Sequence, residues 1–317
     1  MTAAVTASRK SVSRIFFCSV LAAYGGLTGW YLAALVSTSA VSQRPTAGTL
    51  FFQGGILGAC IGLGAGVFDG IAVRSIARIV KFGGTSLLLG LFAGMVALPM
   101  AQFIYDVVGS PNGSSGGGSF LGAVICWVLF GGLIGIGEGI SKGSQTWKAL
   151  VGGMLGGVFG GGVYEAIGRA PSQGASVHEQ AVLAFALTIL GGGIGCAIAL
   201  VNTVLKDAWL VIENGKLAGT EINISKYVHP QLGSRRAGII GSSQWDANVY
   251  LPGDGGISPR HASISYVDGL PTLTALPESI ARRYTTSVNG RPVKSWPLSN
   301  GDRLQIGSTT ILYRHSR

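Results

Sequence analysis

The stretch GDGGISPRHASI, from Gly253 to Ile264, differs in character from the chain that precedes it. Residues 15–200 consist mostly of Gly, Leu, Val, Ile, Ala and Phe, whereas this stretch holds a glycine-rich turn and then a serine, an arginine and a histidine. Its last residues alternate between polar and apolar side chains, which is typical of a strand entered from a loop. The sequence therefore predicts that the fold class changes before this stretch.

Short alternating runs separated by turn residues continue on both sides of it, from Lys206 onward. The runs are AWLVIENG, TEINIS, AGIIGSS, ANVYL, HASISYVDG, PTLTAL, YTTSVNG and DRLQIGSTTILYR. Eight or more short strands within roughly 110 residues are typical of an all-β sandwich. Residues 206–317 are therefore expected to form such a domain.

The motifs of this part resemble those of the forkhead-associated (FHA) domain. IIGSSQWDANVYLPGDGGISPRHASI is followed by SVNGRPV and then by PLSNGDRLQIGSTTILY. The resemblance extends over roughly residues 207–315 and implies a β-sandwich whose loops at one end bind a phosphothreonine peptide. The residues that match the family pattern are Gly241, Ser258, His261, Ala262, Asn289, Gly290, Leu298, Gly301, Asp302, Ile306 and Gly307.

The resemblance also implies which residues bind and which support the loops. A phosphate carries about −1.5 to −2 charge and three acceptor oxygens, so it favours arginine together with hydroxyl or amide donors. The phosphopeptide-binding candidates are Ser258, Arg260, Ser242, Thr285 and Thr286. The residues expected to support the binding loops are Gly241, His261, Asn289 and Gly290.

The sequence departs from the family pattern at three places. Ser242 stands where the family has an arginine, Pro259 stands where a second arginine is expected, and the asparagine expected near Tyr284 is absent. Arg260 lies next to the second place and is the expected replacement. Other arginines in neighbouring loops either replace the missing charge or form an ordinary solvated face: Arg235, Arg236, Arg282 and Arg283.

The composition of the first two thirds of the chain predicts an α-helical membrane bundle. Charged residues make up 11% of the chain, against about 25% in ordinary soluble domains. Six segments are long and apolar enough to cross a bilayer, which needs about 20 residues. They are residues 15–36, 51–73, 82–105, 120–140, 149–167 and 180–204, so we expect a basic N-terminus over residues 1–14 and six spans within 15–205.

The positive charges between these segments predict their orientation. With the N-terminus in the cytoplasm, one set of loops carries Arg9, Lys10, Arg14, Arg74, Arg78, Lys81, Lys142 and Lys148, and the other carries Arg44 and Arg169. Cytoplasmic loops carry the excess of Lys and Arg. We therefore expect both termini in the cytoplasm, in a cell membrane of bacterial inner-membrane type.

Glycines recur at every fourth position in several of these segments. The stripes include Gly54, Gly58, Gly62, Gly66 and Gly70, and then Gly131, Gly135, Gly139 and Gly143. Small residues at this spacing let helices approach closely in lipid, so a glycine zipper is expected. Such stripes serve contacts between chains as readily as within one, so a homo-oligomer is left open.

The sequence also contains an internal repeat. Residues 62–106 resemble residues 131–165, with Asp69 and Asp106 corresponding to Glu138 and Glu165. Repeated units are common in transporters and channels. However, these carboxylates fall at the ends of the segments, where we expect them to lie in the headgroup region near Lys and Arg.

The sequence lacks the motifs of several function classes. The net charge of +10 is spread over both parts of the chain without a basic run, so no nucleic-acid partner is expected. The four cysteines stand apart and the four histidines show no ligand spacing, so we expect no metal, no cofactor and no catalytic residues. The chain is not expected to be an enzyme.

Three hypotheses remain. In the first, a membrane-anchored FHA domain binds a cytoplasmic protein that a Ser/Thr kinase has phosphorylated on threonine. In the second, the domain is a scaffold that docks partners without phosphate. In the third, the membrane part is a channel or transporter that the FHA domain regulates.

Overall fold

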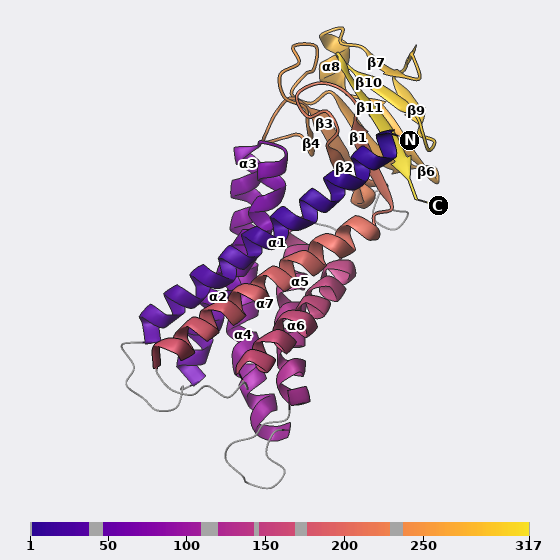
Figure 1. Ribbon diagram of the computed structural model, residues 1–317. Coiled ribbons are helices and arrows are strands. Elements are labelled where there is room, and N and C mark those ends of the chain that lie inside the picture. Colours follow the sequence, from indigo (N-terminus) through magenta and orange to yellow (C-terminus); the bar gives the residue numbers. More distant parts are fainter. Residues whose placement is uncertain are drawn as a thin grey trace. The chain divides into compact units, whose positions relative to one another are not determined.

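The computed structural model describes residues 2–37, 47–108, 120–142, 146–168, 176–228 and 237–316. These residues divide into two compact units. One consists of helices within residues 11–70 and 79–204, and the other contains the β-structure of residues 205–317 (Figure 1). Each unit is described by itself below.

The helical unit confirms that the apolar segments are helices. The elements of this part of the chain are α1 (Thr2–Ser37), α2 (Ala47–Ala72), α3 (Ile76–Arg78), the π-helix η1 (Ile79–Gly83), α4 (Gly84–Val108), α5 (Phe120–Lys142), α6 (Thr146–Gly168) and α7 (Ser176–Val204). Among the described residues, five stretches are long and apolar enough to cross a membrane: Val12–Val36, Gly48–Ala72, Ile76–Ile104, Gly122–Ile140 and Leu183–Val204.

The remaining predicted span, residues 149–167, lies within the 23-residue helix α6, so this segment is also helical. Its crossing of a membrane stays a prediction, because the side chains of Tyr164, Glu165 and Ile167 at its end lie outside the described part of the structure.

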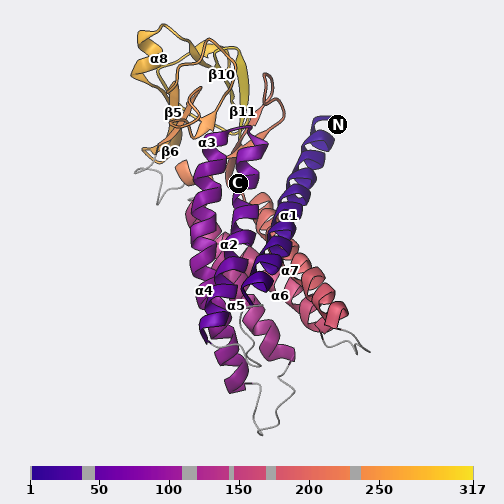
Figure 2. The ribbon, with the colours of Figure 1, turned by 90° about the vertical axis from the view of Figure 1, so that its left-hand side faces the viewer.

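Glycines allow α2 and α4 to lie in direct backbone contact. A methyl group added at Gly58 would overlap the carbonyl of Gly90, and one added at Gly94 would overlap the carbonyl of Gly54. The two helices run side by side in Figure 2. Any larger residue at these points would have to push the helices apart.

The same kind of contact joins α5 to α6 and α6 to α7. A methyl group at Gly153 would overlap the carbonyl of Gly131, and one at Gly157 would overlap the carbonyl of Trp127. On the other side of α6, the backbone of Ile194 lies against Gly156. Helix α6 therefore packs closely against both of its neighbours.

Glu138, predicted to lie in the headgroup region near Lys and Arg, is only 2% exposed between helices. Its depth in a membrane stays a prediction. The Ser86 hydroxyl of α4 donates a hydrogen bond of 2.6 Å to Glu138 Oε2 of α5. The side chains of Asp69, Asp106 and Glu165, as well as Gly143, lie outside the described part of the structure.

The second unit is a two-layered β-structure, which confirms the predicted sandwich. Its elements are β1 (Ala208–Ile212), β2 (Glu221–Asn223), the 3-10 helix η2 (Ser225–Tyr227), β3 (Gly238–Gly241), β4 (Val249–Tyr250), β5 (Ala262–Val267), β6 (Leu270–Ala275), α8 (Pro277–Ala281), β7 (Thr286–Val288), β8 (Arg291–Pro292), β9 (Ser295–Pro297), β10 (Arg303–Ile306) and β11 (Thr309–His315).

One sheet has the order β2-β1-β11-β10-β7-β8 and the other has the order β4-β3-β5-β6-β9. The strands pair antiparallel, except that β3 and β4 are parallel. Asn289 and Gly290 form the turn between β7 and β8, where both adopt the positive φ angles of 51° and 79° that a tight hairpin turn needs.

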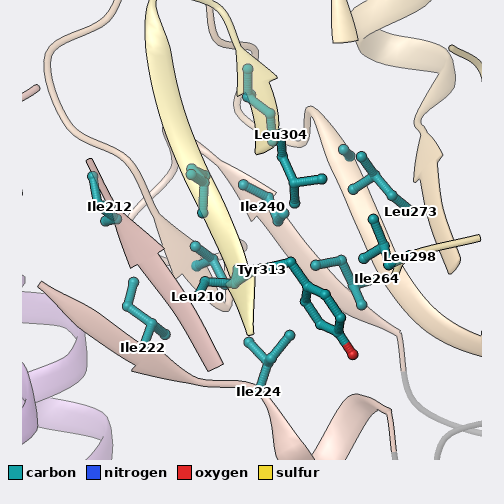
Figure 3. Packing of buried hydrophobic residues seen from close by; sticks show 14 of the residues in the cluster. Leu210, Ile212, Ile222, Ile224, Ile240, Ile264, Leu273, Leu298, Leu304 and Tyr313 are labelled. Carbon is teal, nitrogen blue, oxygen red and sulfur yellow. The ribbon is translucent and has the colours of Figure 1, made fainter. Parts of the chain in front are cut away.

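The core of the sandwich lies between the two sheets. Leu210 and Ile311 come from the first sheet and Ile240, Ile264 and Leu273 from the second, and none is more than 1% exposed. Figure 3 shows the side chains of Leu210, Ile240, Ile264 and Leu273 between the strands. Burying a side chain of this size stabilises the fold by about 1.5–3 kcal/mol.

Candidate peptide-binding loops

Three loops meet at one end of the sandwich. They are residues 242–248 after β3, residues 251–261 before β5, and residues 282–285 between α8 and β7. The first two lie together because β3 and β5 pair antiparallel, with Ile240 opposite Ala262. The end of β3 and the start of β5 therefore lie at the same edge of the sheet.

Backbone hydrogen bonds clamp the first loop to the second. The Ser242 N–H donates to the Ser258 carbonyl at 3.1 Å, and the Ser243 N–H donates to the Pro259 carbonyl at 3.3 Å. The Ser242 hydroxyl donates to the Ile257 carbonyl at 3.0 Å. Gly241 lies so close to Pro259 that any side chain would overlap its carbonyl.

His261 joins the second loop to the third. Its Nδ1 accepts a hydrogen bond from the Ser258 N–H at 3.3 Å. Its Nε2 therefore carries the proton and donates to the Thr286 hydroxyl at 3.1 Å. The ring is fully buried and stacks on Tyr284 with 6.2 Å between ring centroids. This geometry fits the predicted structural role of His261.

The surroundings of His261 favour the neutral ring. Burial lowers its pKa from the ordinary value of 6.5. The hydrogen bond to the Thr285 backbone and the charge of Asp254 raise the pKa, but burial outweighs both. The folded loops therefore hold a neutral histidine at pH 7.

Asp254 ties the second loop to the turn between β10 and β11. Its Oδ2 accepts hydrogen bonds from the Ser308 N–H at 2.7 Å and the Ser308 hydroxyl at 2.8 Å. Its Oδ1 accepts from the Gly256 N–H at 2.9 Å. Burial raises the pKa of the carboxyl, but the hydrogen bonds from Gly256, Ser308 and Thr309 outweigh it and leave the pKa below 3.8.

Acid is expected to destabilise the sandwich through His261. Because the folded pKa of His261 is lowered, its contribution to stability is complete above the unfolded pKa and is lost as the pH falls below it. Asp254, whose pKa is also lowered, adds a further loss below about pH 4. The Tm, followed by circular dichroism, should fall between about pH 7 and pH 5.

His315 provides the control for this prediction. It is exposed at the end of β11, so His315→Gln should leave the pH dependence as in the wild type. His261→Gln should flatten the dependence of the Tm between about pH 7 and pH 5. Equal slopes in the two variants would contradict the assignment of the acid sensitivity to His261.

Of the predicted phosphate-binding residues, Arg260 and Thr285 are exposed. Two others, Ser258 and Thr286, are buried in this conformation, and their binding role stays a prediction. Ser258 is 0% exposed and its hydroxyl donates to the Arg260 carbonyl at 3.0 Å. Thr286 is 4% exposed and contacts His261. Ser242 is half-buried and directs its hydroxyl to a backbone carbonyl.

Asn289 and Gly290 make their contacts away from the loops they were expected to support. They lie at the other end of β7, where Asn289 Nδ2 donates to Asp302 Oδ1 at 2.8 Å. The Arg303 N–H donates to Asn289 Oδ1 at 2.9 Å. These contacts support the sheet, because the asparagine amide bridges the β7–β8 turn to the start of β10.

Arginines of the third loop lie on the surface. Arg282 and Arg283 are both exposed, and Arg283 has a left-handed backbone with φ of 56°. The Tyr284 N–H donates to the Ser279 carbonyl and thereby ends helix α8. Arg235 and Arg236 lie outside the residues that the structure describes.

Two residues at this end were missed by sequence reasoning. Glu278 of α8 lies beside Arg260, with 4.0 Å between Oε1 and Nη1. Trp245 of the first loop is 71% exposed. The sequence offered one signal for Trp245, a tryptophan in a polar turn between two strands. For Glu278 it offered none, because the place of α8 beside the second loop depends on the folded domain.

The comparisons with known proteins agree with this part of the fold. The family model for the FHA domain matches residues 238–307, and no family model matches the helical residues before them. The FHA domain-containing protein FhaA of Mycobacterium tuberculosis is 40% identical over 76 residues, which are 24% of this chain. The match spans only 13% of the length of FhaA.

Two solved structures have similar domains. One, from a structural and functional analysis of phosphothreonine-dependent FHA domain interactions, is 28% identical, with a TM-score of 0.28, and covers 35% of this chain and 98% of its own. The other is the FhaA FHA domain complexed with the intracellular domain of Rv3910, at 29% identity and a TM-score of 0.27, over 34% and 99%. On the match of the family model and the observed β-sandwich, residues 238–307 of this protein are an FHA domain.

Proposed function

We propose that the chain is an integral membrane protein whose FHA domain binds a cytoplasmic protein carrying phosphothreonine. The observation that carries the proposal is Arg260. It is exposed on a loop that is clamped on both sides, to Ser242 and Ser243 of the first loop and through His261 to the third. An arginine on a rigid loop is a suitable donor for a phosphate because its planar fork loses little freedom on binding.

Glu278 competes with a bound phosphate for the guanidinium of Arg260. It lies 4.0 Å from Arg260, and both side chains are nearly half exposed, at 46% and 49%. An exposed pair of this kind contributes little to stability. A phosphate with nearly two negative charges is a stronger partner for the guanidinium than one carboxylate, so the pair can open when a phosphopeptide binds.

The buried hydroxyls favour a second candidate, a scaffold that binds its partner without phosphate. Ser258 is inward-facing and Ser242 replaces the family's arginine, so two of the expected phosphate contacts are missing in this conformation. The partner would then be recognised by the surface of the loops alone.

A peptide library separates these candidates. The full-length chain in detergent is titrated with fluorescent peptides of degenerate sequence around a central threonine, either phosphorylated or unphosphorylated. Binding confined to phosphothreonine peptides supports the proposal. Equal binding of both libraries would overturn it in favour of the scaffold, and a phosphoserine library measures the selectivity for the threonine methyl group.

For the helical part, we propose six membrane spans with both termini in the cytoplasm. Five helices satisfy the length and hydropathy requirements. The case for α6 as the sixth is its packing, since it contacts α5 through Gly153 and α7 through Gly152, Gly156 and Gly160. These contacts extend over about two turns on the α7 side alone. A helix packed in this way between two spans would itself have to lie in the membrane.

Reporter fusions should place residues 143–145 and the C-terminus on the cytoplasmic side, and residues 169–175 on the outer side. The reason is that six spans, an even number, return the chain to the side on which it began. Alkaline phosphatase and green fluorescent protein fused after residues 144, 172 and 317 measure this. An active phosphatase at residue 317 would mean that the number of spans is odd.

The contacts also support the proposed duplication of a helical hairpin, with glycine zippers in both copies. In both hairpins, the two helices are in close contact at glycines. The pairs are Gly58 with Gly90 and Gly66 with Ser86 in the first hairpin, and Trp127 with Gly157 and Gly135 with Gly153 in the second. A regulated channel and a homo-oligomer remain proposals that flux assays in proteoliposomes and cross-linking would test.

A further inference from the structure

The loop that follows β3 presents an exposed tryptophan on a rigid turn. The Ser243 hydroxyl donates to Asp246 Oδ2 at 2.8 Å and accepts from the Asp246 N–H at 3.2 Å. The Ala247 N–H donates to the Ser243 carbonyl at 3.2 Å and closes one helical turn. Trp245 lies in the middle of this turn. Its backbone is therefore fixed before any partner arrives.

The side chain of Trp245 is open to solvent, although its backbone is held. It is 71% exposed, whereas the large residues of β4 that follow the first loop, Val249 and Tyr250, are at most 8% exposed. A large aromatic surface left in water is costly, since about 25 cal/mol is lost for each Å² of apolar surface not buried. Tryptophan is also the residue type most enriched at the energetic centres of protein interfaces.

The turn is attached directly to the loop that carries Arg260. Ser243, which closes the turn, donates its N–H to Pro259, the neighbour of Arg260. Gln244 Nε2 donates to the Tyr250 hydroxyl at 3.2 Å and holds the other side of the turn. Trp245 and the proposed phosphate donor therefore lie on two loops whose backbones are hydrogen-bonded to each other. A peptide bound at Arg260 extends over neighbouring loops, and Trp245 is the apolar surface that the first loop offers.

We propose that Trp245 is a specificity-determining residue that binds an apolar side chain flanking the phosphothreonine of the partner. This inference rests on the proposed function. The phosphate supplies the charge for Arg260, and the flanking Leu, Ile or Met covers the indole ring. The indole gives the domain a means of distinguishing among phosphothreonine sequences, because burial of apolar surface depends on the flanking residue while the phosphate contact does not.

The test uses the full-length chain in detergent and phosphothreonine peptides in which each flanking position carries Leu, Ala, Arg or Glu. Fluorescence anisotropy should show that the wild type binds the best Leu peptide about tenfold more tightly than its Ala counterpart. Trp245→Ala should bind the two peptides equally and still prefer phosphorylated peptides. Trp245→Phe should retain part of the preference for Leu. The Tm of both variants should be unchanged, since the side chain is exposed.

Tryptophan emission gives an independent readout. The best peptide should shift the emission of the wild type to shorter wavelength, and this shift should be absent in Trp245→Phe. A Leu preference that survives in Trp245→Ala would overturn the inference while leaving the proposed function intact. A preference for the Arg peptide over the Leu peptide would likewise overturn the inference. If vesicles of mixed neutral and anionic lipids shift the emission and peptides do not, the indole binds lipid and the inference fails. Failure of the wild type to distinguish phosphorylated peptides would instead defeat the proposed function.

Discussion

Arg260→Ala is expected to weaken phosphothreonine-peptide binding by roughly 10- to 150-fold. The estimate follows from the worth of a hydrogen bond to a charged group, about 1.5–3 kcal/mol. Arg260 is the exposed arginine of the clamped second loop, and the family's arginine is absent at Ser242, so the rest of this loop offers no second guanidinium. Isothermal titration of the full-length chain with the best phosphopeptide measures the change.

Arg291→Ala is the matched control, because it removes the same charge from an exposed residue at the β7–β8 turn. It should leave the Kd within about twofold, the effect of a distant surface charge. Arg260→Lys should recover part of the affinity, since lysine restores the charge without the planar fork. Equal effects of Arg260→Ala and Arg291→Ala would show that only the net charge of the domain matters. If Arg260→Ala left the Kd unchanged, Arg282 and Arg283, which are also exposed, would be the next residues to substitute.

Gly153→Ala and Gly162→Ala are expected to change the stability of the helical unit in opposite directions, although both are glycines of α6. A methyl group at Gly153 would overlap the Gly131 carbonyl of α5, whereas nothing lies within 4 Å of one at Gly162. Overpacking of this kind typically costs about 1–3 kcal/mol. At Gly162 alanine should instead stabilise the helix by up to about 1 kcal/mol, because it restricts the unfolded backbone.

Thermal unfolding of the purified chain in detergent, followed by helix circular dichroism, measures both effects. The Tm should fall for Gly153→Ala and stay level or rise for Gly162→Ala. The corresponding pair in α4 is Gly94→Ala, which would overlap the Gly54 carbonyl, and Gly84→Ala, which has open space around it. If the two variants of either pair behaved alike, backbone contact between the helices would not be what these glycines provide.

The sequence by itself predicted the long helices of the first part and most strands of the second, but not the short helix α8 between β6 and β7. The apolar segments predicted helices because their length and composition are properties of a continuous stretch of chain. Alternation and turn residues predicted the strands in the same way, and the Asn289–Gly290 turn forms where the sequence places it. The FHA motifs were recognisable because they consist of short stretches whose spacing the sequence shows directly.

Only the tertiary structure decided which of the candidate side chains are available to a partner. Ser258 and Thr286 were candidates by position, but both are buried. His261 accepts a hydrogen bond from the Ser258 N–H and donates one to the Thr286 hydroxyl. The position of Glu138 in its helix gave no sign that Ser86 of another helix would donate a hydrogen bond to its buried carboxylate. The direction of a side chain in a loop or between helices depends on contacts with residues far away in the sequence. Periodicity within one segment carries no record of those contacts, which is why Trp245 and Glu278 became visible only in the folded domain.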